Sequence, residues 1–324
     1  MAGSSVQTDK KHLIMVILAF AAVYIIWGTT YLGIRIAIET IPPFFMSGSR
    51  VLTAGTLLFL FLRARGASRP TRVQWRSAVI VGALLLGGGS GLVAWSEQEV
   101  PSGTAALIVA TVPLWIALFD WFIFRGGRPG KRVTAGLILG LIGIFLLVGP
   151  EQILGTATFS LFFLFALLLS PISWSFGSLY SRGAPLPEDA IMGSAMEMIG
   201  GGVVLLTAGL LTGEAAQFDP AAVSSTSLLI WIYLVFFGSI IAFSAYIWLL
   251  KEVPATKAST YTYVNPVIAV FLGWLVLDEP VTPVTIISSV IIILAVILIQ
   301  TARTEELPAD EATQELVSES TGHQ

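Results

Sequence analysis

The stretch WSEQEVPSGTAALIVATVPLWIALFDW, residues 95–121, has a counterpart in WLLKEVPATKASTYTYVNPVIAVFLGW, residues 248–274. Both copies contain a leading tryptophan, a Glu-Val-Pro triplet four residues later, a second proline and a closing tryptophan. Every matched position is displaced by 153 residues. Earlier in the chain, Trp27 and Trp174 are separated by 147 residues. Recurrence at a fixed displacement indicates an internal repeat, so the chain is predicted to consist of two diverged copies of one unit.

The repeated unit is strongly apolar. Apolar residues make up 55% of the chain and charged residues 11%, whereas about 25% of residues are charged in soluble domains. Apolar blocks of about 18 residues or more are typical of membrane helices. Ten such blocks are predicted, at residues 13–34, 44–62, 76–96, 102–124, 132–149, 159–180, 190–212, 227–250, 256–277 and 283–301. The expected fold is an all-α integral membrane protein with ten transmembrane helices in two five-helix repeats.

The distribution of charge predicts the orientation of these helices. If the N-terminus lies inside, the inner loops contain Lys10, Lys11, Arg63, Arg65, Arg69, Arg72, Arg76, Arg125, Arg128, Lys131, Arg132, Arg182, Lys251, Lys257 and Arg303. The outer loops then contain Glu97, Glu99, Glu151, Glu214, Asp219, Asp278 and Glu279. Because Lys and Arg accumulate in cytoplasmic loops, both termini are expected in the cytoplasm.

An odd number of spans per repeat means that the second copy enters the membrane from the opposite side. The residue that corresponds to Arg125 in the second copy is Asp278, which fits an exchange of inside for outside. Inverted repeats build secondary transporters, with the substrate site near the membrane midplane between the halves. The alternative is a duplication that produced only a large helical bundle.

Four segments are predicted along the chain. Residues 1–12 form a cytoplasmic tail, residues 13–149 the first five-helix repeat and residues 150–302 the second, inverted repeat. Residues 303–324 are acidic with few apolar residues, which is typical of a disordered tail.

Several kinds of chemistry are excluded by residue types that the sequence lacks. Cysteine is absent, and both histidines, His12 and His323, lie in the predicted tails, which removes thiol catalysis, disulfides and histidine metal sites from the membrane interior. Neither an HExxH motif nor a phosphate-binding loop occurs. The chain is therefore not expected to be an enzyme or to need a cofactor or metal ion. Its expected partners are a small-molecule substrate and the lipid bilayer, not nucleic acid, and a monomer is favoured over a homodimer.

Local motifs in both halves resemble the EamA family of the drug/metabolite transporter superfamily. They are Trp27–Tyr31 (WGTTY), Pro101–Gly103 (PSG), Thr111–Leu114 (TVPL), Asn265–Val267 (NPV) and Asp278–Pro280 (DEP). The resemblance implies a ten-helix exporter of amino acids, related metabolites or toxic organic compounds in the bacterial inner membrane. The family often ends its fourth helix with a glycine–glutamate pair, but this chain has Arg125–Arg128 (RGGR) there. A gating role for that glutamate carries over only to Glu279.

Two prolines are predicted to kink helices beside the site. Pro113 and Pro266 each fall near the middle of an apolar span, where a proline frees a carbonyl about one turn earlier. The freed carbonyls, near Val109 and Thr262, are candidates to face a polar ligand because irregular backbone is tolerated at membrane depth where it lines a cavity. The alternative is a packing kink at each proline.

Aromatic and hydroxyl residues at the same depth supply the remaining candidates. Aromatic rings bind planar or apolar groups and attract cations through their faces. The predicted substrate-binding residues are Trp27, Thr30, Tyr31, Arg50, Thr111, Trp115, Trp174, Ser178, Tyr180, Tyr261, Tyr263 and Asn265. An aromatic belt at the membrane surface is the alternative for the rings.

Charged residues at membrane depth are costly and hence candidates for function. Arg50 and Glu197 occupy matched positions, 147 residues apart, in the second helix of each repeat. Each either binds a charged group or is held by backbone carbonyls as a structural lock. Glu97, near the outer end of the third span, is a second candidate for proton coupling besides Glu197, with an ordinary solvated loop acid as the alternative.

Glycines are predicted to allow close packing or movement. Residues 87–91 read GGGSG in the third span, and Gly136 and Gly140 form a GxxxG face in the fifth. That face packs either within the monomer or against a second copy.

Together these features predict a secondary exporter of small amphipathic metabolites that works by alternating access, with proton coupling as one option. The alternatives are an uncoupled facilitator or exchanger and, further away, an intramembrane enzyme or a lipid-handling protein.

Overall fold

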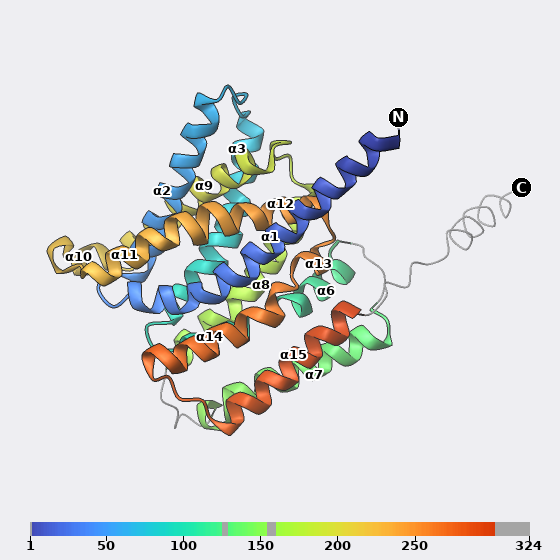
Figure 1. The fold of residues 1–324 in the computed structure, drawn as a ribbon. Coiled ribbons are helices and arrows are strands. Elements are labelled where there is room, and N and C mark those ends of the chain that lie inside the picture. The colour runs from blue at the N-terminus through green and yellow to red at the C-terminus, as the bar shows by residue number, and fades with distance from the viewer. Residues whose placement is uncertain (1, 125–128, 154–159, 302–324) are drawn as a thin grey trace, which may run out of the picture.

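The computed structural model describes residues 2–124, 129–153 and 160–301, and within these ranges it is helical and contains no strand (Figure 1). Seven helices are long and apolar enough to cross a membrane: His12–Ala37, Pro43–Ala64, Arg72–Ser96, Ser102–Phe122, Leu161–Gly183, Ala190–Leu211 and Ser225–Glu252. Two shorter apolar helices, Val264–Leu277 and Pro283–Ile299, lie near the end of the described chain. This is the all-helical architecture expected of an integral membrane protein.

Each apolar range predicted from the sequence contains helix. The first part of the chain forms α1 (Ala2–Ala37), α2 (Pro43–Ala64), α3 (Arg72–Gly82), η1 (Ala83–Gly91), α4 (Leu92–Ser96), α5 (Ser102–Val109), α6 (Val112–Phe122) and α7 (Lys131–Ile153). The second part forms α8 (Leu161–Gly183), α9 (Ala190–Leu211), α10 (Glu214–Gln217), η2 (Pro220–Ala222), α11 (Ser225–Tyr233), η3 (Leu234–Phe243), α12 (Ser244–Glu252), α13 (Ala255–Ala258), α14 (Tyr261–Leu277) and α15 (Pro283–Thr301). Because α1 begins at Ala2, the predicted N-terminal tail is continuous with the first helix. The predicted acidic tail and Arg125–Arg128 lie outside the described residues.

Two π-helical segments, η1 and η3, widen the helical turn at matching places in the two parts of the chain. They overlap when residues 83–91 are displaced by 153. In η1 the glycine run permits close packing, because a Cβ added at Gly89 would lie 2.6 Å from the ring of Trp174. Wide turns of this kind occur frequently at functional sites.

The fourth span is divided rather than kinked. It was predicted as one helix bent at Pro113, but α5 ends at Val109 and α6 begins at Val112, with Pro113 in its first turn. A proline is favourable at that position because the N–H that it lacks would have no partner in the helix. Pro266, by contrast, lies inside α14.

Contacts between helices follow a reciprocal pattern. Helix α1 packs against α14 and η3, whereas α8 packs against α6 and η1. The helices α2 and α9, second in their respective repeats, pack on each other, as do α7 and α15 (Figure 1). In these contacts, equivalent helices of the two repeats therefore pack against equivalent elements of the other repeat.

The GxxxG face in α7 packs within the monomer. A Cβ at Gly136 would lie 2.6 Å from Ile299 of α15, and one at Gly140 would lie 2.7 Å from Leu114 of α6. The absence of these Cβ atoms therefore brings α7 close to its neighbours in the same chain.

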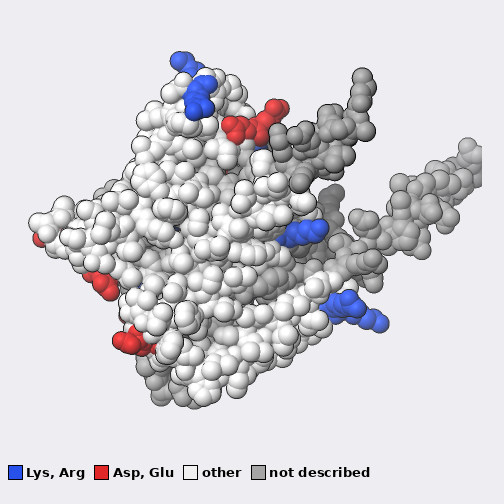
Figure 2. Space-filling view, viewed as in Figure 1, with Lys and Arg blue, Asp and Glu red and all other residues white. Residues whose placement is uncertain are grey.

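The surface is largely uncharged across the face formed by α1, α12, α14 and α15 (Figure 2). In this view Lys and Arg gather along the upper and right edges, and Asp and Glu occur mainly along the left and lower edges, apart from one acidic group near the top. An apolar band between charged ends is what a membrane-embedded chain requires.

Candidate functional site

A cavity lies among helices of both repeats. It is lined by Trp27, Thr30, Tyr31, Ile34, Arg50, Val51, Leu86, Gly89, Ser90, Val93, Val109, Ser170, Trp174, Met198, Gly238, Ser239, Phe243 and Tyr261. Most of this lining is apolar or aromatic, with one charged side chain, Arg50.

Matched positions of the two repeats meet at this cavity. The lining contains four residue pairs at the repeat displacements, namely Trp27 with Trp174, Val51 with Met198, Leu86 with Ser239, and Ser90 with Phe243. The two π-helical segments, η1 and η3, supply the last two pairs. The cavity therefore lies where the two repeats face each other.

An aromatic cluster forms one wall of the cavity. The ring of Trp27 lies 5.4 Å from that of Trp174, 5.1 Å from that of Tyr261 and 5.2 Å from that of Tyr246. The first two contacts are edge-to-face, a favoured geometry for aromatic rings. The indole N–H of Trp27 donates to the carbonyl oxygen of Gly238, 3.2 Å away in η3. The first helix is thus tied to the wide turn of the other repeat.

Hydrogen bonds fix the second tryptophan from behind. The indole N–H of Trp174 donates to the hydroxyl oxygen of Tyr246 at 3.1 Å, and that hydroxyl also lies 2.8 Å from the hydroxyl of Ser178. The Ser178 hydroxyl in turn donates to the carbonyl of Trp174 at 2.7 Å. Both Tyr246 and Ser178 are fully buried, so the orientation of the Trp174 ring is set before any ligand binds.

Arg50 is the charged side chain of the cavity wall. It is 6% exposed, and its Nη2 donates to the hydroxyl of Ser90 at 3.1 Å. Its Nε is buried without a hydrogen-bond partner among the described residues. The guanidinium therefore has capacity to donate to a further group.

Glu97 is not part of the cavity lining and lies one residue beyond the span that ends at Ser96. Its side chain is fully buried, and neither carboxylate oxygen has a hydrogen-bond partner among the described residues. Arg35 donates to its backbone carbonyl, not to the carboxylate. Burial, with the nearby negative charge of Glu279, raises the pKa of Glu97 well above its usual range, against the opposing influence of Arg35 and Arg50. This environment favours the protonated carboxyl.

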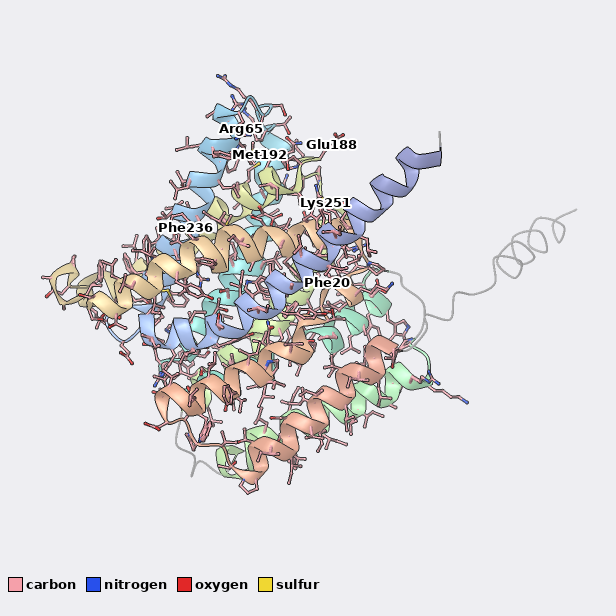
Figure 3. The ribbon with its side chains drawn as sticks, in the orientation of Figure 1. Phe20, Arg65, Glu188, Met192, Phe236 and Lys251 are labelled. Atoms are coloured by element: carbon pink, nitrogen blue, oxygen red, sulfur yellow. The ribbon has the colours of Figure 1, made fainter. Side chains whose placement is uncertain are left out.

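Glu197 is a second buried carboxyl without a hydrogen-bond partner among the described residues, in α9. It does not line the cavity. Lys251 donates instead to the carbonyls of Pro187 and Glu188, at 2.7 and 2.8 Å (Figure 3). Glu197 and Arg50, matched in sequence, therefore occupy different surroundings.

The structure brings half of the predicted binding residues to the cavity. Those that line it are Trp27, Thr30, Tyr31, Arg50, Trp174 and Tyr261. Ser178 supports the wall from behind, and the side chain of Tyr263 lies outside the described residues.

The remaining predicted residues are directed elsewhere. Thr111 donates to the carbonyl of Ile108 at 2.7 Å, and Tyr180 stacks on Phe176. Neither Trp115 nor the buried Asn265 lines the cavity. Of the carbonyl positions expected near the prolines, Val109 lines the cavity and Thr262 does not, while Pro266 lines an apolar groove between α14 and α15.

Sequence reasoning missed several residues of the site, chiefly Ser90, Ser239, Phe243 and Tyr246. The repeat displacement would have found two of them, since Leu86 and Ser90 lie in the glycine-rich third span and correspond to Ser239 and Phe243. Within the described ranges, no three His, Asp or Glu side chains are grouped closely enough to hold a metal ion.

Comparison with known proteins matches the model of the EamA-like transporter family to residues 13–149 and again to residues 161–301. The chain belongs to this family. Its relatives are transporters, which fits a transport protein better than an enzyme.

Three relatives illustrate the similarity. The "Uncharacterized inner membrane transporter YedA" of Escherichia coli K12 is 39% identical over 290 residues, which cover 89% of this chain and 92% of YedA. The "Uncharacterized transporter YoaV" of Bacillus subtilis is 29% identical, covering 86% of this chain and 94% of YoaV. "Protein PecM" of Dickeya dadantii is 26% identical, covering 85% and 89%.

A solved crystal structure shares the fold. It is 20% identical, has a TM-score of 0.63, and the match covers 88% of this chain and 96% of the other. With these comparisons, this EamA-family chain is a multi-pass protein of the bacterial inner membrane.

Proposed function

We propose that this protein is a secondary transporter that exports small amphipathic metabolites by alternating access between two inverted five-helix halves, residues 13–149 and 150–302. The observation that carries the proposal is the cavity whose wall is built from matched positions of both repeats, such as Trp27 with Trp174. A site shared symmetrically between halves can open to either side when the halves exchange their packing.

The reciprocal helix contacts support the inverted arrangement. The contacts of α1 with α14 and η3 correspond to those of α8 with α6 and η1, as a two-fold relation between the halves requires. In the proposal all ten predicted ranges cross the membrane, five in each half, and both termini lie in the cytoplasm. The internal packing of Gly136 and Gly140 supports a monomer.

Contacts between the halves at one end of the bundle support a gating role for two carboxylates. Glu279 accepts hydrogen bonds from the backbone N–H groups of Ser102 (2.8 Å) and Gly103 (3.1 Å), at the start of α5. Glu214 does the same at the start of α2, from Phe44 (3.0 Å) and Phe45 (2.9 Å). A carboxylate at a helix N-terminus is stabilised by the helix dipole, and opening this end must break these bonds.

Proton coupling is proposed through Glu97, with Glu197 as a second coupling residue. A buried carboxyl without hydrogen-bond partners favours the protonated form and releases its proton when water reaches it. Access of water from one side and then the other would let Glu97 exchange a proton in each cycle. The electrostatic interaction between Glu97 and Arg50, which lines the cavity, links this proton exchange to the substrate site.

Reconstitution into liposomes tests the function. Protein-containing and empty vesicles are loaded with a mixture of amino acids, nucleosides and aromatic amphipathic compounds, and efflux is followed by mass spectrometry. We expect one class of compound to leave chemically unaltered, faster when a pH gradient is imposed. Unaltered efflux that is indifferent to the gradient would favour an uncoupled facilitator. A chemically altered product would contradict transport and favour an intramembrane enzyme, and lipid movement alone would favour a lipid-handling protein.

A further inference from the structure

We infer that the cavity takes a molecule that carries a carboxylate, or an anion of similar shape, on an aromatic or apolar body, with the anion bound by Arg50. The inference rests on the proposed transport function and narrows its substrate class. The buried guanidinium of Arg50 has more hydrogen-bond donors than acceptors around it. It has five N–H donors, and its hydrogen-bond partner among the described residues is Ser90.

The charge of Arg50 is not matched by a contacting acid. The salt bridge found within the described ranges joins His12 to Glu252, far from the cavity wall. Glu97 acts on Arg50 through its charge but does not contact it. A buried charge without a partner is costly, so a ligand that supplies the missing acceptor is favoured. A carboxylate meets this need because both of its oxygens fit the fork of the guanidinium.

The different accessibility of Arg50 and Glu97 from the cavity favours an anionic ligand over a cationic one. Arg50 lines the cavity, whereas Glu97 has no exposed surface and does not line it. A ligand that enters the cavity therefore meets the positive group. A cationic ligand would face Arg50 at close range, while the buried carboxyl of Glu97 is not part of the lining.

The rest of the wall defines the body of the ligand. Four rings line the cavity from Trp27, Tyr31, Trp174 and Tyr261, and Phe243 adds a fifth ring 6.4 Å from Trp174. Thr30, Ser90, Ser170 and Ser239 add small hydroxyl groups to the same lining. Ring walls bind planar or apolar groups, so the anion is expected to carry an aromatic or branched apolar substituent.

Three probes that each carry a phenyl ring on a short alkyl chain test the charge preference. They are 3-phenylpropionate (anionic), 3-phenylpropan-1-ol (neutral) and phenethylamine (cationic), titrated calorimetrically into the purified full chain in detergent. We expect the propionate to bind about tenfold or more tightly than the alcohol, since hydrogen bonds to charged groups are roughly twice as strong as neutral ones, and the amine to bind weakest. Tighter binding of the amine, or no binding of any probe, would overturn the assignment.

Variants at Arg50 assign the effect to this side chain. Arg50→Gln is expected to weaken propionate binding by about tenfold or more while changing alcohol binding less than about twofold. Arg50→Lys keeps the charge but loses the fork, so an intermediate loss is expected, and it serves if the glutamine variant does not fold. Arg76→Gln, which removes an exposed arginine of α3, is the matched control and should bind as the native protein does. An equal loss for all three probes would contradict anion recognition by Arg50.

The experiments give different results if the anion site is wrong and if the transport function is wrong. Selective, Arg50-dependent binding of the propionate without flux in liposomes would leave the anion site in place and remove transport. Flux of unaltered compounds with no preference for the anion would retain transport and overturn the anion site.

Discussion

At the cavity, the two tryptophans of the repeats are held by ring contacts and by hydrogen bonds to their indole N–H groups. Trp27 and Trp174 hold each other edge-to-face, and each indole N–H has a fixed acceptor, the Gly238 carbonyl or the Tyr246 hydroxyl. Buried indole N–H groups need such partners. The orientations of the two rings are therefore fixed by contacts within the protein before a ligand binds.

Removing either ring should abolish transport without preventing folding. For Trp27→Ala and Trp174→Ala we expect at least a tenfold fall in efflux per folded molecule, because each substitution removes a ring of the binding wall and the edge-to-face contact, worth about 1 kcal/mol. Efflux from liposomes and membrane insertion are measured together. Trp274→Ala is the control, because that side chain is 52% exposed and lines no part of the cavity. Unchanged efflux per folded molecule with a large loss of stability would assign both rings to packing.

Glu97→Gln tests proton coupling while preserving the shape of the side chain. Because burial raises the pKa of Glu97, the folded protein holds the proton at a pH where a solvated carboxyl has lost it. Any stability contributed by the protonated form is therefore lost as pH rises, not as it falls. The glutamine imitates the protonated carboxyl at every pH, so accumulation driven by a pH gradient should disappear while exchange down the substrate gradient remains.

The control for this experiment is Glu39→Gln, an exposed acid near the end of α1. Accumulation in the Glu97→Gln protein that matches the native level would remove Glu97 from the mechanism and leave uncoupled facilitation.

At the level of helices, the carboxylate of Glu279 joins the start of α5 to the segment between α14 and α15. Glu279→Gln should lower the free energy of unfolding by about 1–2 kcal/mol, because a neutral amide interacts more weakly with the helix N-terminus. Thermal unfolding in detergent measures the effect. Asp278→Asn is the matched control, since Asp278 is exposed and asparagine tolerates its left-handed backbone (φ 52°). Equal unfolding temperatures for both variants would remove the contact from the account.

The helices were largely predictable from the sequence, whereas their irregularities were not. Apolar length predicted the helical ranges because only a helix satisfies the backbone of such a block in lipid. The division at Pro113 was missed because a proline is equally compatible with a kink and with the first turn of a new helix. In η1, Gly89 packs closely against Trp174, a residue far away in the sequence, and no local pattern contains such a contact.

At the scale of the whole molecule, the repeat predicted which surfaces meet, and the cavity lies there. Trp27 and Trp174 were found because both copies retain the same rare residue. Arg50 and Glu197 share the repeat position but differ in surroundings, since Arg50 lines the cavity and Glu197 is buried outside its lining. Tyr246 was missed because its counterpart, Val93, gives no chemical signal.

The proposed inverted topology predicts opposite exposure for two loops. The chain has no cysteine, so single cysteines can be introduced at Thr71 and Thr282, both exposed. In intact cells an impermeant thiol reagent should label the cysteine at position 282 and spare the one at position 71, because cation-rich loops lie inside. Permeabilised cells, in which both should react, provide the control. The reverse pattern in intact cells would overturn the proposed orientation.

Access to the cavity from both sides is the central claim, and a cysteine at Ser239 tests it most directly. This side chain lines the cavity from η3. An impermeant thiol reagent is applied separately to right-side-out and inside-out vesicles of the Ser239→Cys protein. The account predicts labelling in both preparations, with substrate slowing both reactions. Labelling from one side alone, whether substrate is present or absent, would contradict alternating access.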